Sequence, residues 1–220
     1  MTYTFHWEVP LQNLPQFLWG ALATLEMSGV ACLLGSLVAV AGALARLSKN
    51  KYLRRAATAY VEVIRNTPFI VQLFYVYFGL VTVGVNLEAF SVAIITLTLN
   101  CGAYCTEIIR AGIQSIHKGQ REAAFSLGMT EGQSMFLVVL PQAVRRILPP
   151  LAGQFITLIK DSSLISVIAV SDLTYVAKNI VTNTFRAFEV WLAIAVFYFV
   201  LSFALSWSVR NLEYRLAKSD

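Results

Sequence analysis

Long apolar runs without a charged residue are the feature that most constrains how this chain folds. Each of four such runs is close to the ~20 residues that an α-helix needs to cross a bilayer. They are Met27–Ala45, Asn66–Leu87, Ala89–Thr106 and Val190–Val209. A fifth stretch, Ile147–Ser171, is apolar except for Lys160 and Asp161 at its centre. We therefore expect an all-α integral membrane protein with about five transmembrane helices.

The overall composition also favours a membrane protein over a soluble one. The chain is 57% hydrophobic and only 13% charged, with a mean hydropathy of +0.66. Soluble domains are roughly 45–50% apolar and 25% charged. The length of 220 residues suits one unit, and no repeat or low-complexity linker divides it. Residues 1–220 are expected to form a single transmembrane domain.

The distribution of Lys and Arg predicts the orientation. Five spans place the loop after the first run, the central loop and the tail on one side, and thirteen basic residues lie there. They are Arg46, Lys49, Lys51, Arg54, Arg55, Arg110, Lys118, Arg121, Arg145, Arg146, Arg210, Arg215 and Lys218. The opposite side has only Lys178 and Arg186. Because Lys and Arg accumulate in cytoplasmic loops, the N-terminus is expected outside and the C-terminus inside. The net charge of +5 then reflects topology and contact with lipid, and no nucleic-acid partner is expected.

Residues that mark other kinds of chemistry are sparse. Cys32, Cys101 and Cys105 all fall inside apolar runs and are interpreted as small packing residues. His6 has no second His, Cys or acid at metal-ligand spacing, so no metal site is expected. Residues 1–17 contain no Lys or Arg, which does not fit a cleaved signal peptide.

The central segment Gln120–Pro141 is polar and helix-forming. Gln120 to Leu127 predicts a short helix that Gly128 ends, since glycine readily adopts the left-handed conformation that closes helices. Thr130 suits the N-cap of a second helix, with Gln133 as its capping-box partner. Two interpretations stay open from these residues. Small side chains favour insertion into a groove on another protein: Ala123, Ala124 and Ser126. Three apolar ones instead favour resting on lipid: Phe125, Leu127 and Met129.

The spacing of this segment resembles the EAA motif of ABC importer permeases. That motif reads EAA, three residues, G, nine residues, I-x-LP, and this chain departs from it only in Val138 for Ile. The stretches "YVEVIRNTPFIVQLFYVYFGL", "NCGAYCTEIIRAGIQSIHKGQ" and "LAGQFITLIKDSSLISVIAVSDL" are similar to the polar amino acid permease branch, which includes histidine, glutamine, glutamate and arginine types. The resemblance covers about residues 18–216.

The resemblance implies a type I ABC importer permease fold in the bacterial inner membrane. Its coupling helices, here about residues 119–141, would dock into a cytoplasmic ATP-binding subunit. The residues implied in that contact are Gln120, Glu122, Ala123, Ala124, Gly128 and Met129. Two ATP-binding subunits, a second permease chain (the same or related), an external substrate-binding protein, membrane lipid and an amino acid substrate are the expected partners.

Polar residues inside the fifth stretch point to a substrate path. An ionisable group at the bilayer centre costs at least ~2.5–3.5 kcal/mol, so Lys160 and Asp161 need a reason to be there. Each could be neutralised by a neighbouring helix or a partner subunit. The alternative is a water-lined cavity in which an acid and a base meet an amino acid zwitterion. Ser162 and Ser163 either bond back to carbonyls or point into that cavity.

Two other runs supply candidates for the same path. Asn66, Thr67 and Pro68 place a proline in the second run, where it either opens the helix to a ligand or only kinks it for packing. Asn100 and Tyr104 share a helical face that is expected to look into the bundle or a pore. At the inner end of that run, Glu107 and Arg110 are interpreted as an intrahelical ion pair.

The function expected from all of this is ATP-driven import of a polar or charged L-amino acid. The chain holds no Gly-x-x-x-x-Gly-Lys-Ser/Thr loop, so ATP and Mg²⁺ are expected in a separate ATPase subunit and no cofactor in this chain. The chain itself is not expected to be an enzyme. The alternatives are an ion-driven secondary transporter and a membrane anchor without a transport path of its own.

Overall fold

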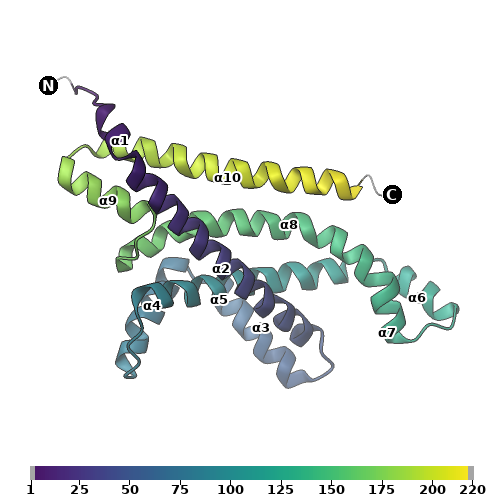
Figure 1. Cartoon of the computed structure of the whole chain (residues 1–220). Coiled ribbons are helices and arrows are strands. Elements are labelled where there is room, and N and C mark those ends of the chain that lie inside the picture. The colour runs from purple at the N-terminus through teal and green to yellow at the C-terminus, as the bar shows by residue number, and fades with distance from the viewer. Residues whose placement is uncertain (1–2, 218–220) are drawn as a thin grey trace.

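The computed structural model describes residues 3–217, with side chains as far as Asn211. The regular structure of this part of the chain is entirely helical, with no strand (Figure 1). Four helical segments are long and apolar enough to cross a membrane, which confirms four of the five expected spans. They are Leu14–Leu47 (α2), Ala89–Gln114 (α5), Glu131–Ile168, and Ala187–Asn211 within α10 (Ala187–Ala217). The third comprises α7 (Glu131–Gln133), a π-helical segment η1 (Ser134–Val139), α8 (Leu140–Asp161) and a 3-10 segment η2 (Ser162–Ile168).

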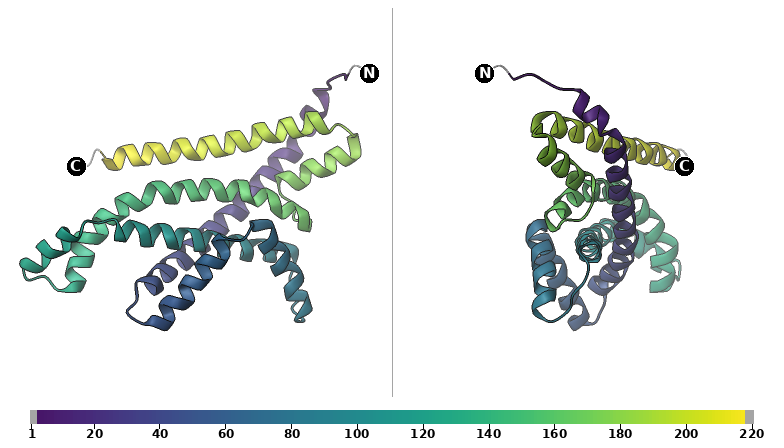
Figure 2. Two further views of the ribbon diagram at one scale, coloured as in Figure 1. Left: turned by 180° about the vertical axis from the view of Figure 1, so that it is seen from behind. Right: turned by 60° about the vertical axis from the view of Figure 1, so that its left-hand side comes forward.

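The second expected span, Asn66–Leu87, is wrong in its bounds. The apolar helix there, α4 (Phe69–Thr82), has 14 residues, or about 21 Å, which is less than the ~30 Å hydrocarbon core. A second helix, α3 (Lys51–Arg65), precedes it where the sequence favoured a basic loop. The buried Val61 and the Tyr60 hydroxyl, which donates to Leu99 O at 2.6 Å, hold α3 on α5. The two helices meet at an angle in Figures 1 and 2.

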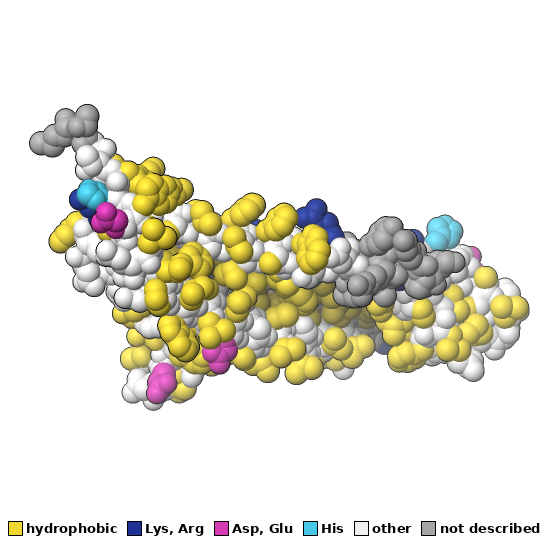
Figure 3. Space-filling view, turned by 45° about the horizontal axis from the view of Figure 1, so that its top comes forward, with side chains coloured by type: hydrophobic (Ala, Val, Ile, Leu, Met, Phe, Trp, Pro, Cys, Tyr) yellow, Lys and Arg dark blue, Asp and Glu magenta, His cyan; other side chains and the backbone are white. Residues whose placement is uncertain are grey.

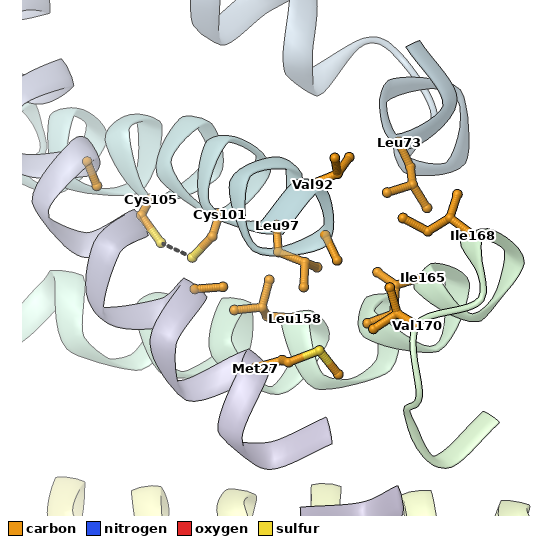
Figure 4. Packing of buried hydrophobic residues seen from close by; sticks show 13 residues of the cluster. Met27, Leu73, Val92, Leu97, Cys101, Cys105, Leu158, Ile165, Ile168 and Val170 are labelled. Atoms are coloured by element: carbon orange, nitrogen blue, oxygen red, sulfur yellow. Dashed lines mark hydrogen bonds between the residues drawn. The ribbon is translucent and has the colours of Figure 1, made fainter. Parts of the chain in front are cut away.

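The main core lies where α2, α5, α8 and η2 meet. Met27, Leu97, Leu158 and Ile165 are almost fully buried there and point toward one another in Figure 4. Cys101 and Cys105 are buried in the same core as free thiols, which confirms their interpretation as packing residues.

Small residues let α2 and α5 approach closely. A Cβ atom on Gly42 would lie 2.3 Å from the hydroxyl of Thr106 on α5. Such contacts are typical of membrane helices, whose association depends on close packing rather than on exclusion of water.

A buried carboxylate anchors the outer helix α9 (Leu173–Thr184). Asp172 is fully buried and caps α9 by accepting a hydrogen bond from Tyr175 N at 2.7 Å. Its other oxygen lies 3.4 Å from the Tyr198 hydroxyl of α10. Burial raises the pKa of Asp172 to about 6. Leu173 N donates to Thr24 Oγ1 at 3.1 Å, so this polar cluster joins α9 to both α2 and α10.

The surface agrees with a membrane environment. Hydrophobic side chains cover most of the flank seen in Figure 3, and few charged ones interrupt them. Along α10 the exposed large side chains include Trp191, Phe199, Phe203 and Trp207. The short N-terminal helix α1 (Glu8–Gln12) lies at the opposite end from α6 (Lys118–Ser126) and α7, and α10 runs toward that second end (Figures 1 and 2). The end of the basic tail, residues 218–220, lies outside the described residues.

Candidate functional site: a polar cavity and a coupling segment

A cavity of about 640 Å³ opens where three stretches of the chain meet. Residues at the junction of α3 and α4, on α5 and near the end of α8 line it. They are Arg65, Asn66, Thr67, Pro68, Phe69, Asn100, Tyr104, Gln154, Thr157 and Asp161. One acidic and one basic side chain therefore share this cavity with three carboxamides and three hydroxyl groups.

One wall of the cavity is the break between α3 and α4, residues Arg65–Pro68. Pro68 has no N–H and its backbone is extended, so α3 ends at Arg65 and α4 begins only at Phe69. The Arg65 guanidinium carbon lies 5.4 Å from the centre of the Tyr104 ring, and the Tyr104 hydroxyl is 3.5 Å from Arg65 O. The proline thus separates two helices rather than kinking one continuous span.

The opposite wall ends in Asp161, which is also at a change of helix type. The α-helical turns of α8 stop at Asp161, and the tighter η2 follows until Ala169 reverses the chain at φ 61°. Asp161 is half-buried, and its carboxylate accepts no side-chain or backbone hydrogen bond among residues 3–211. Two interrupted helices therefore meet at one polar cavity, an arrangement that transporters use to present charged and backbone groups to a ligand.

The structure brings together six of the nine residues that the sequence assigned to the substrate path. Those lining the cavity are Asn66, Thr67, Pro68, Asn100, Tyr104 and Asp161. The other three lie outside its lining. Lys160 is exposed on a neighbouring face because consecutive helical residues project about 100° apart. Ser162 is fully buried and donates to Ile159 O at 2.7 Å, and Ser163 belongs to the following 3-10 turn.

Four lining residues had no role in the predicted substrate path: Arg65, Phe69, Gln154 and Thr157. Arg65 therefore provides the cationic group in the cavity that had been expected from Lys160. Gln154 precedes Asp161 by seven residues and shares its helical face, which is the signal that would have found it. Just beyond the cavity, Glu107 forms ion pairs with Arg46 and Arg110, which confirms the expected Glu107–Arg110 pair.

The coupling segment, residues 119–141, contains α6, α7 and η1. His117 caps α6 by accepting a hydrogen bond from Gly119 N at 3.1 Å. The helix closes when Met129 N donates to Ala124 O at 3.1 Å and Gly128 N donates to Phe125 O at 2.9 Å. This is a Schellman closure, and it requires the left-handed backbone of Gly128, whose φ is 76°. The expected helix end at Gly128 is confirmed.

The second half of the coupling segment also follows the expected local rules. Thr130 Oγ1 accepts from Gln133 N at 3.3 Å, and Gln133 Oε1 accepts from Thr130 N at 2.8 Å, so the capping box is confirmed. The wider π turns of η1 lead into Pro141, which has no N–H to donate. Gln120 Oε1 accepts from Gln142 Nε2 at 3.1 Å and ties α6 to α8.

The exposed surface of α6 differs from the expectation at one position. Glu122, Ala123 and Gly128 are exposed, but Ala124 is only 3% exposed, on a helix that packs against η1. Leu127, by contrast, is 82% exposed at the tip of the segment. Lys49 Nζ lies 2.9 Å from Glu131 Oε2, which raises the pKa of Lys49. Both charged side chains of that pair are exposed.

Comparison with known proteins places the whole arrangement in one family. Residues 32–218 match the family model described as "Binding-protein-dependent transport system inner membrane component". The chain belongs to this family. Its coupling segment and polar cavity are therefore parts of a transport subunit.

Several relatives match over nearly their whole length. The chain is 38% identical over 214 residues to the glutamine transport system permease protein GlnP of Escherichia coli, covering 96% of this chain and 98% of that protein. It is 43% identical over 208 residues to the probable glutamine ABC transporter permease protein GlnM of Bacillus subtilis, with coverage of 94% and 96%. The L-cystine transport system permease protein TcyB of Bacillus subtilis is 39% identical over 212 residues, with coverage of 96% and 91%.

Solved structures agree with the fold. A chain of an amino acid ABC transporter, crystallised with histidines, superposes with a TM-score of 0.93 at 40% identity and covers 97% of this chain and 100% of that one. The methionine transporter MetNI in an inward-facing conformation gives a TM-score of 0.74 at 22% identity, which supports the fold alone.

The chain is thus a multi-pass inner-membrane permease subunit of an ABC importer with a type I permease fold. It is a transport subunit rather than an enzyme, and a separate subunit hydrolyses ATP. An ATPase, a substrate-binding protein and a permease partner are implied by the same membership. Neither an ion-driven secondary transporter nor an anchor without a transport path fits this family.

Proposed function

We propose that this permease imports a polar, uncharged L-amino acid such as glutamine, and that the cavity binds it. The observation that carries the proposal is the pairing of one cationic and one anionic group in the same cavity, Arg65 and Asp161. A zwitterionic amino acid has an α-carboxylate for the guanidinium and an α-ammonium for the carboxylate. Charge-assisted hydrogen bonds of this kind are roughly twice as strong as neutral ones.

The remaining lining residues suit an uncharged polar side chain. With the α-groups matched to Arg65 and Asp161, the cavity offers carboxamides and hydroxyls, which both donate and accept hydrogen bonds. A buried charged side chain would lack a counter-ion there and would be costly. The names of GlnP and GlnM, which refer to glutamine, agree with this preference.

The energy source and the assembly complete the proposal. Two copies of an ATP-binding subunit, with ATP and Mg²⁺, receive the coupling segments of two permease chains, which are either identical or related. An external binding protein delivers the amino acid. Closure of the ATPase dimer moves the coupling segments and turns the cavity outward, and hydrolysis returns it inward. Gln120, Glu122, Ala123, Gly128 and Met129 act at this contact, with Ala124 packed beneath them.

Direct binding tests the substrate part of the proposal. Tritiated L-glutamine is added to the purified permease–ATPase complex without its binding protein, and unlabelled amino acids compete for it. Unlabelled glutamine is expected to displace the label, whereas arginine and glutamate at the same concentration displace little. Stronger displacement by arginine or glutamate would contradict an uncharged substrate.

A further inference from the structure

We infer that Gln72 is a positioning residue for the cavity, because its side chain holds the break between α3 and α4 in shape. Gln72 lies in the first turn of α4, is only 8% exposed and does not line the cavity. It therefore acts through other groups. The inference rests on the proposed function, in which the cavity binds the transported amino acid.

The break leaves backbone carbonyls that need partners. The last four carbonyls of a helix have no intrahelical donor, and in α3 these belong to residues 62–65. Three of them receive a hydrogen bond from residues of the cavity lining. Asn66 N donates to Glu62 O at 3.1 Å, and Thr67 Oγ1 donates to Val63 O at 2.9 Å. The Tyr104 hydroxyl donates to Arg65 O at 3.5 Å.

The fourth carbonyl, Ile64 O, receives its short hydrogen bond from Gln72, beside a longer one of 3.5 Å from Thr67 Oγ1. Gln72 Nε2 lies 2.7 Å from Ile64 O and 2.8 Å from Thr67 O, with Thr67 Oγ1 at 3.0 Å. A carboxamide nitrogen has two hydrogens, so both are used by Ile64 O in the last turn of α3 and Thr67 O within the break. One buried side chain of α4 thus ties that helix to the end of α3 and to the segment between the two helices.

The same side chain also fixes the orientation of a lining residue. Because Gln72 Nε2 is bound to the backbone, only its Oε1 is left for Asn100, whose Nδ2 lies 3.0 Å away. Asn100 must therefore present its NH₂ group to Gln72. Its carbonyl oxygen is then the group that can accept a hydrogen bond from an ammonium or amide N–H in the cavity.

These contacts predict an effect on ligand affinity that exceeds the effect on folding. Gln72→Leu removes the donors to Ile64 O and Thr67 O as well as the acceptor for Asn100. Gln72→Glu has nearly the same shape and keeps the acceptor but loses both donors. The matched control is Leu73→Ala, because Leu73 is fully buried on the same helix and makes no polar contact with the break.

The experiment measures the dissociation constant of tritiated L-glutamine for the permease–ATPase complex without binding protein, together with the melting temperature of each variant. Gln72→Leu is expected to weaken binding about tenfold or more, since small misplacements of binding groups cost up to ~100-fold. Gln72→Glu is expected to weaken it as well. Leu73→Ala is expected to lower the melting temperature and to leave the dissociation constant within about twofold, because it removes only buried packing.

One result would overturn the positioning role of Gln72, and another would overturn the proposed role of the cavity. The variant Asp161→Asn distinguishes the two results. Wild-type binding by both Gln72 variants, with binding lost in Asp161→Asn, would overturn the positioning role and leave the cavity as the substrate site. Wild-type binding by all three variants would show that the substrate binds elsewhere, and the proposed function of the cavity would then fail.

Discussion

The coupling segment and the polar cavity are built in opposite ways. The coupling segment is local: its caps and closures join residues within about six positions of one another, such as Ala124 with Met129 and Thr130 with Gln133. The cavity is assembled from three separate stretches of chain, with Arg65 and Asp161 almost a hundred residues apart. In the proposed function the first acts through a partner protein, whereas the second carries its charged and polar groups itself. Substitutions in the two regions should therefore affect different steps.

The largest effect is expected from Gly128→Val. A β-branched residue at φ 76° is strained, and the closure of α6 would be lost. ATP hydrolysis stimulated by the loaded binding protein is expected to fall about tenfold or more, because the helix can no longer dock as a rigid unit. Glutamine binding to the cavity should stay unchanged.

Gly132→Ala is the matched control, since Gly132 lies in the same segment without a left-handed backbone and has open space around it. Its ATPase activity is expected to remain close to that of wild type. A Gly128→Val complex that still couples normally would show that the closure of α6 is not needed for docking.

Asp161→Asn is expected to have the opposite effect to Gly128→Val, because it should weaken glutamine binding and leave ATP hydrolysis in place. Losing a charged hydrogen bond of about 1.5–3 kcal/mol weakens glutamine binding by roughly 10- to 150-fold. Basal ATP hydrolysis should persist because the coupling segment is intact. Lys160→Met is the control next to it, and a dissociation constant within about twofold of wild type is expected because Lys160 lies outside the cavity lining. Equal losses of glutamine affinity in both variants would show that Lys160 also belongs to the substrate path.

A smaller effect, on stability alone, is expected at Asp172, which belongs to neither region. Its folded-state pKa of about 6 lies above the ordinary 3.8, so its contribution favours folding below pH 3.8 and is lost as the pH rises through 6. Asp172→Asn keeps a capping side chain and removes the titration. The melting temperature of the wild type should fall between pH 4 and pH 7.5 relative to that of the variant. Parallel pH profiles would contradict this assignment.

The smallest effect is expected at the contact between Lys49 and Glu131, which joins the coupling segment to the turn after α2. Both side chains are exposed, and exposed ion pairs commonly contribute little. Lys49→Met should change neither the melting temperature nor ATPase stimulation at ~0.15 M salt, where such pairs are screened. A clear loss of stimulation would show that the coupling segment depends on this turn.

The contrast between a locally encoded coupling segment and a cavity built from distant stretches also explains what could be predicted from the sequence. Gly128 encodes the end of α6, and Thr130 with Gln133 encodes the capping box, so both were predictable from local sequence. Polar residues inside apolar runs revealed Asn100 and Asp161. The sequence could not predict which of Lys160 and Asp161 lines the cavity. The two side chains project about 100° apart on a helix, and nothing local shows which of them faces inward.

Other features depended on contacts that no local pattern encodes. The basic residues of α3 resembled a loop, so the helix before the break, and with it the cavity role of Arg65, was missed. Gln72 in an apolar helix had no visible partner, because the carbonyls that it satisfies are free only once the chain breaks at Pro68.

The most direct test of the central claim is uptake of tritiated L-glutamine into proteoliposomes that contain this permease and its ATP-binding subunit. Binding protein is added on one side and ATP on the other. The account predicts accumulation against a concentration gradient that requires both additions and disappears in Gly128→Val and in Asp161→Asn. Accumulation driven by an ion gradient without ATP would contradict it.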